Sequence, residues 1–204
     1  MQKKTVRRYQ TGMVRRYLML AFMIAFGYLC EVCVMPYIRI FNVTPNLLYV
    51  MIGVVTVAYG KLRAFWAGLI YGLLMEIMLP SVPYLNLAIY PISTLFCSFA
   101  FADKPLKTLE YERATNKKSK ERPAWLRTVL CTALNTLIYE VVNVTYIYLG
   151  GSALLAGHFL KAIADVILTS LLCLGLLFPL RRMILGKKNE TLILKSAPFM
   201  FRKG

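Results

Sequence analysis

The chain has 204 residues, of which 58% are hydrophobic and 17% are charged, and its mean hydropathy is +0.58. This composition excludes an ordinary soluble domain and predicts one membrane domain over residues 1–204. The formal charge of +16 could indicate a nucleic-acid-binding protein. The basic residues lie in short blocks between apolar runs, however, so we expect no nucleic-acid partner and assign the charge to membrane orientation.

The apolar runs predict an all-α bundle of six transmembrane helices, because about 20 apolar residues cross a hydrocarbon layer roughly 30 Å thick. In chain order, the predicted spans are residues 17–38, 43–60, 64–79, 84–102, 125–149 and 158–180. The second and third are short and almost contiguous, so we expect them to form a tight helical hairpin. The first is too long for the core of a signal peptide and should remain as an anchor.

Lysine and arginine residues orient these spans, because short loops rich in them stay in the cytoplasm. All 25 except Arg39 and Lys161 fall on one side of a six-span chain. The sequence therefore predicts an N-in, C-in topology, with a basic N-terminus (1–16), a cytoplasmic loop (103–124) and a basic tail (186–204). Membrane lipid head groups are the first expected contact of these basic segments, and a cytoplasmic protein partner is the alternative.

Enzyme signatures are missing from the sequence. There is no Gly-x-Ser-x-Gly, no His-Glu-x-x-His and no Gly-rich phosphate loop. Cys30 and Cys33 form a Cys-x-x-Cys pair, but no second pair completes a tetrahedral metal site. We therefore predict a non-enzymatic protein that has no metal and no cofactor, and we interpret the cysteines as small core residues.

Charged residues inside the spans are the most informative feature, because each is costly if it faces lipid alone. The helical rise of about 1.5 Å per residue places the four acids in the outer half of the bundle. Lys161 and Asp165 are four residues apart on one helix face and can pair. The predicted intramembrane polar cluster consists of Glu31, Glu76, Glu140, Asp165, Lys161 and Arg39.

Two interpretations of this cluster stay open. Buried salt bridges and hydrogen bonds could fix the packing of the helices. A water-filled outward cavity could instead bind a ligand or a polar group of a partner.

Small residues recur every four positions along the third span, at Ala64, Gly68 and Gly72, and the ridge they form ends at Glu76. Such spacing lets another helix approach closely within a membrane. A second small pair, Ala21 and Ala25, lies on the first span. Packing within the chain is the default interpretation of both, and docking of another protein's membrane helix is the alternative.

Three consecutive segments resemble the rod shape-determining MreD family: TPNLL at residues 44–48, YGKLR at 59–63 and AGLIYGLLME at 67–76. Members of that family usually show Pro-Asn or Pro-Asp before the second span and Gly-x-x-x-Gly-Leu-x-x-Asp in the third. Here Glu76 stands where Asp is usual, which keeps the charge and lengthens its reach. The match is most specific over residues 44–102.

The resemblance implies a scaffold in the bacterial plasma membrane that takes part in cell elongation and cell shape. It implies work with MreC, with the actin-like MreB, and with the wall synthase RodA and its partner transpeptidase. It also makes the ridge of the third span a candidate seat for a partner helix, and the basic loop and tail candidate contacts for MreB.

The substrate-binding S components of energy-coupling-factor vitamin transporters provide an alternative. They also have six spans, and the MreD family is thought to share their fold. Some dock their coupling partner through an Ala-x-x-x-Ala pair on the first span, which Ala21 and Ala25 would match. On this alternative, the four intramembrane acids would line an outward pocket for a cationic or polar vitamin.

Overall fold

The structure is a computed structural model that describes residues 2–40, 42–78, 83–102, 123–151, 153 and 155–195. Within these ranges the chain forms six α-helices and no strand, which confirms the all-α prediction. The helices are α1 (Gln2–Cys33), α2 (Leu47–Tyr59), α3 (Lys61–Met78), α4 (Leu85–Phe101), α6 (Ala124–Leu149) and α7 (Ala156–Lys195), with a 3-10 turn η1 (Met35–Tyr37) after α1.

Three segments are long and apolar enough to cross a membrane: Tyr17–Tyr37, Ala124–Leu149 and Ala156–Met183. They correspond to the first, fifth and sixth predicted spans and indicate a membrane protein. α2 and α4 are apolar but shorter. α2, with 13 residues, is roughly 20 Å long, which is less than the thickness of a hydrocarbon layer.

The first and last helices of the chain extend beyond the predicted spans. α1 begins at Gln2 rather than near residue 17, and α7 continues to Lys195 instead of ending near residue 180. Lysine, arginine and glutamate are good helix formers, so a helix can continue after its apolar part has ended. Most of the predicted cytoplasmic loop (residues 103–122) and the end of the tail (196–204) lie outside the described residues.

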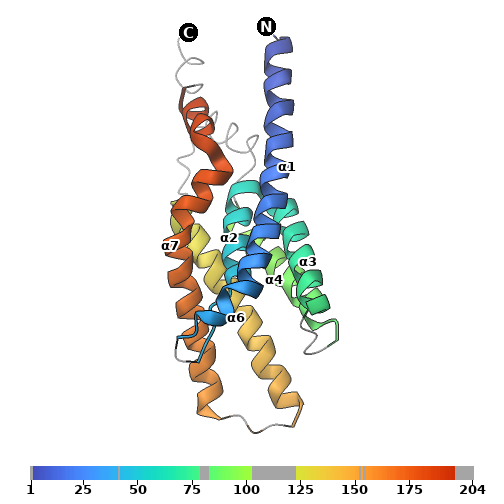
Figure 1. Ribbon diagram of the computed structural model, residues 1–204, viewed down its shortest axis with the longest axis vertical. Helices are drawn as coiled ribbons and strands as arrows, with labels where there is room; N and C mark the ends of the chain where they lie inside the picture. The colour runs from blue at the N-terminus through green and yellow to red at the C-terminus, as the bar shows by residue number, and fades with distance from the viewer. Residues whose placement is uncertain are drawn as a thin grey trace.

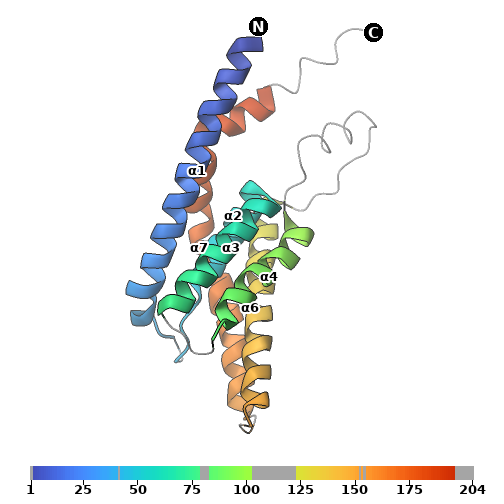
Figure 2. The same ribbon diagram turned by 90° about the vertical axis from the view of Figure 1, so that its right-hand side faces the viewer.

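α2 lies at the centre of the bundle, in contact with α1, α3, α4, α6 and α7 (Figure 1). The start of α1 and the end of α7 lie at the same end of the molecule, at the top of Figure 1. At the opposite end, α6 and α7 project beyond the other helices, as both views show (Figure 2). The bundle therefore consists of one enclosed helix and five that surround it.

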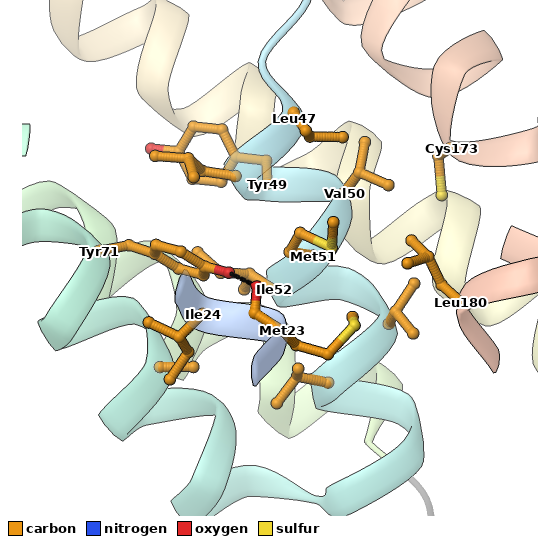
Figure 3. Close-up of a cluster of buried hydrophobic side chains, with 14 of the residues drawn as sticks. Met23, Ile24, Leu47, Tyr49, Val50, Met51, Ile52, Tyr71, Cys173 and Leu180 are labelled. Atoms are coloured by element: carbon orange, nitrogen blue, oxygen red, sulfur yellow. Dashed lines mark hydrogen bonds between the residues drawn. The ribbon is translucent and has the colours of Figure 1, made fainter. Parts of the chain in front are cut away.

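Residues 47–57 of α2 are all buried. A helix that is apolar all round is expected to be enclosed on every side, and the sequence LLYVMIGVV fits that expectation. Figure 3 shows its side chains interleaved with those of neighbouring helices, where the Tyr71 hydroxyl of α3 donates a 3.0 Å hydrogen bond to the Met23 carbonyl oxygen of α1. This bond ties two surrounding helices together beside α2.

A single residue, Gly60, connects α2 to α3. Its φ of +85° lies in the left-handed region, where glycine is favoured because it has no Cβ. The Gly60 amide still donates a 3.1 Å hydrogen bond to the Thr56 carbonyl oxygen, which completes the last turn of α2. The predicted tight connection between these two helices is therefore present.

Candidate functional site

Asn46 fixes the start of α2 to two other helices. As the N-cap residue, its Oδ1 accepts a 3.3 Å hydrogen bond from the Tyr49 amide. Its Nδ2 donates to the Tyr90 hydroxyl of α4 at 3.2 Å, and its backbone amide donates to Thr169 Oγ1 of α7 at 3.0 Å. The asparagine of the TPNLL segment is therefore the centre of a buried polar network.

A carboxylate from α1 completes this network. Glu31 Oε2 accepts a 2.8 Å hydrogen bond from the amide of Leu47, the first residue of α2. The first amides of a helix have no partner within the helix, and the helix dipole favours a negative charge there. Glu31 is thus hydrogen-bonded to the start of α2 and remains only partly exposed.

Two further acids, on α6 and α7, lie nearby. Asp165 is buried, with 6% of its surface exposed, and its Oδ1 accepts a 3.1 Å hydrogen bond from Thr169. Glu140, on α6, lines the same cavity as Asp165. Two carboxyl groups that line one cavity can together attract a cationic group. A chain of hydrogen bonds therefore runs from Asp165 through Thr169 to Asn46.

A cavity of about 670 Å³ opens over this network. Five members of the predicted polar cluster line it: Glu31, Glu140, Asp165, Arg39 and Lys161. Asn46, Tyr139 and Asn143 add polar groups, while methionine side chains contribute apolar wall. The cavity combines features of the two interpretations that the sequence left open, because Glu31 joins α1 to α2 and also faces an open volume.

The acids and the bases that line the cavity differ in their exposure. Asp165 is buried and Glu31 and Glu140 are half-buried, whereas Arg39 and Lys161 are exposed. Within the described part of the chain, Lys161 makes no ion pair with Asp165, although the two are one helical turn apart. The expected pairing of these residues is therefore not formed. The arrangement suits a ligand that carries both a positive and a negative group.

Glu76 lies apart from the other acids and does not line this cavity. Its Oε1 accepts a 2.6 Å hydrogen bond from the amide of Tyr84, which immediately precedes α4. Its Oε2 is buried without a hydrogen-bond partner among the described residues. Glu76 thus joins the end of α3 to the start of α4. Glu76 was expected to join the other acids because it lies at a similar depth along its helix. In the structure it faces the start of α4, whereas the other acids face the cavity.

The ridge of α3 packs against α4. A Cβ added at Gly72 would lie 2.7 Å from the Asn86 carbonyl oxygen, and one added at Gly68 would lie 2.7 Å from Thr94 Oγ1. Ala64 is fully buried. The small residues therefore serve helix packing within the chain. The suggestion that this ridge seats a partner helix is not supported, because α4 already covers the ridge.

Ala21 and Ala25 have the opposite environment. Both are exposed on the outer face of α1, next to Phe22 and Phe26, whose stacked rings lie 5.7 Å apart. No described helix covers this face. Of the two predicted small-residue surfaces, the one on α1 is exposed and stays open to a partner.

Reasoning from the sequence missed Thr169 and Tyr90 of the polar network and Tyr139 of the cavity wall. The rings of Tyr90 and Tyr139 lie 6.1 Å apart beside the cavity. Thr169 lies four residues after Asp165, a spacing that places both on one helix face and could have identified it. No sequence signal marks the two tyrosines, because aromatic residues are common in membrane helices.

The cysteines form no metal site. All five are free, and no group of three or more metal-ligating side chains occurs in the described part of the chain. Cys30 is half-buried and Cys33 is exposed.

In comparisons with known proteins, no protein-family model, no curated protein and no solved structure gives a significant match to this chain.

Proposed function

We propose that this chain is a non-enzymatic scaffold of the MreD type, in the plasma membrane of a bacterium. The observation that supports this proposal is the role of the residues that carry the resemblance. Asn46 organises the start of α2, and Gly68 and Gly72 seat α3 against α4. These residues build a rigid helical platform, as a scaffold requires, and none of them forms a nucleophile with a base.

The proposed topology has six spans, with both termini in the cytoplasm. The common end at which α1 begins and α7 ends supports an even number of crossings (Figure 1). The distribution of lysine and arginine supports a cytoplasmic location of that end. In a variant whose five native cysteines are replaced by serine, a cysteine placed at Lys118 should react with a membrane-impermeant reagent only after the cells are opened, and labelling in intact cells would contradict the topology.

The proposed partners are MreC, MreB, RodA and its partner transpeptidase. We propose that the membrane helix of MreC contacts the outer face of α1, because Ala21 and Ala25 allow close approach there and Phe22 and Phe26 add contact area. The corresponding ridge of α3 is already occupied by α4.

Copurification tests this proposal. Tagged chain should retain MreC, and the variant with Ala21→Leu and Ala25→Leu should lose most of it. Gly175→Leu is the matched control, because Gly175 is exposed on α7 and an added Cβ would meet nothing within 4 Å. Equal retention of MreC by both variants would exclude the α1 face, and failure of the unmodified chain to retain MreC would contradict the scaffold.

A second candidate function is that of an S component for a cationic or polar vitamin. The cavity of about 670 Å³, with acids in its wall, favours it. An S component should retain a soluble small molecule through purification, which mass spectrometry of the denatured protein would identify. Retention of a vitamin without MreC would support the S-component function and contradict the scaffold function.

A further inference from the structure

A second hollow adjoins the charged cavity. It is a groove of about 490 Å³ between α6 and α7, lined almost entirely by apolar side chains such as Val141, Phe159 and Ile163. These three side chains are exposed by 56%, 49% and 57% respectively. Since α6 and α7 both contain a candidate membrane span, this groove faces the lipid of a membrane.

Glu140 belongs to both hollows. It lines the apolar groove on one side and the charged cavity on the other. Glu140 lies roughly 24 Å along α6 from its first residue, within the candidate span Ala124–Leu149. Apolar and charged surfaces thus meet at Glu140, inside this span.

The charges around this junction match one class of lipid head group. Glu140 and Asp165 both line the charged cavity and together attract a donor with a positive charge. Lys161, one turn from Asp165 along α7, and Arg39 supply the opposite charge at the exposed part of the cavity. A head group with a primary ammonium beside a phosphate complements both the acidic pair and the basic pair.

We propose that the cavity and the α6–α7 groove form one binding site for a phospholipid with a primary-amine head group. Its ammonium group lies between Glu140 and Asp165, its phosphate faces Lys161 and Arg39, and an acyl chain lies along the apolar groove. The ammonium group also relieves the cost of acidic groups within a membrane. A choline head group offers no N–H donor to the two carboxyl groups, and a glycerol head group offers no positive charge.

Lipid retention in native mass spectrometry tests this site. The chain is purified in mild detergent and exchanged against phosphatidylethanolamine, phosphatidylcholine or phosphatidylglycerol. We expect selective retention of phosphatidylethanolamine. In Glu140→Gln, its affinity should fall about tenfold, as expected for one charge-assisted hydrogen bond. Glu76→Gln is the matched control, because this acid lies outside the cavity, and it should retain the lipid as the unmodified chain does.

A second variant addresses the groove. Ala162→Phe adds bulk to the groove wall without altering any charge, and it should also weaken lipid retention. Helix content and elution volume identify a variant that has failed to fold.

Three results would overturn the proposal. Equal retention of all three lipids would indicate unselective contact with the membrane. Full competition by soluble phosphoethanolamine would indicate a water-soluble zwitterion as the occupant. Equal loss in Glu76→Gln and Glu140→Gln would place the effect outside the cavity. None of these results bears on the retention of MreC, so the scaffold and the lipid site are tested separately.

Discussion

Glu31 of α1 and Leu47 of α2 are joined by a 2.8 Å hydrogen bond from the Leu47 amide to the Glu31 carboxylate. Fifteen residues that include η1 separate them in the chain, so this bond closes the connection between the first two helices. A helix that packs on all sides needs its first amides satisfied by its neighbours. Glu31 satisfies one of them with its carboxyl oxygen.

Glu31→Ala should therefore destabilise the protein by about 1–3 kcal/mol, the usual loss when a buried donor such as the Leu47 amide is left without a partner. Glu31→Gln should lose less, because the amide oxygen of glutamine still accepts a hydrogen bond. Thermal unfolding in detergent measures both. Cys33→Ala, at an exposed position on the same helix, is the control, and equal melting temperatures for Cys33→Ala and Glu31→Ala would contradict this role.

Asn46→Ala should cost about 1–3 kcal/mol, because it removes the cap of α2 and the bond to the Tyr90 hydroxyl. Thr44→Ala, at an exposed position two residues earlier, should have almost no effect. A double-mutant cycle with Tyr90→Phe isolates the side-chain bond, since the two changes should be less than additive. Strict additivity would show that Asn46 and Tyr90 act independently.

Gly72→Leu should destabilise the protein by about 1–3 kcal/mol or more, because its Cβ would meet the backbone of α4 at Asn86. Gly175→Leu introduces the same side chain into open space. The comparison of their melting temperatures removes the effect of glycine on helix propensity. If both variants unfold at the same temperature, close packing of α3 on α4 is not what the glycine provides.

Tyr71→Phe should cost about 1 kcal/mol, because it removes the hydroxyl that donates to the Met23 carbonyl oxygen and leaves the ring in place. The ring of Tyr71 is buried, whereas Tyr37 is 88% exposed, so Tyr37→Phe serves as the control. Limited proteolysis of α1 should accelerate in Tyr71→Phe alone. An unchanged rate would mean that this bond does not hold α1 to α3.

The positions of the six helices could be predicted from the sequence, because an apolar run long enough to cross or approach a membrane is visible without any tertiary information. Their ends were less predictable. Residues before 17 and after 180 are rich in charge, and a charged segment can continue a helix or leave it with nearly equal ease. In this chain α1 and α7 both continue as helices into these charged segments.

The polar cluster could be predicted only in part. Depth follows from the helical rise, and it correctly suggested that Glu31, Glu140 and Asp165 occupy similar levels. Which helices face one another does not follow from depth. Glu76 therefore turned out to serve the α3–α4 junction, and α4 turned out to cover the glycine ridge.

The enclosure of α2 has a consequence for how the protein is made. On the proposed topology α2 enters the membrane well before α6 and α7 exist, yet the amide of its N-cap residue is bonded to Thr169 of α7. Until then the Asn46 amide must find a temporary partner in water, in a head group or in the insertion machinery. A chain released before Ala156 would keep that amide unsatisfied, and it should be a preferred target for membrane quality-control proteases.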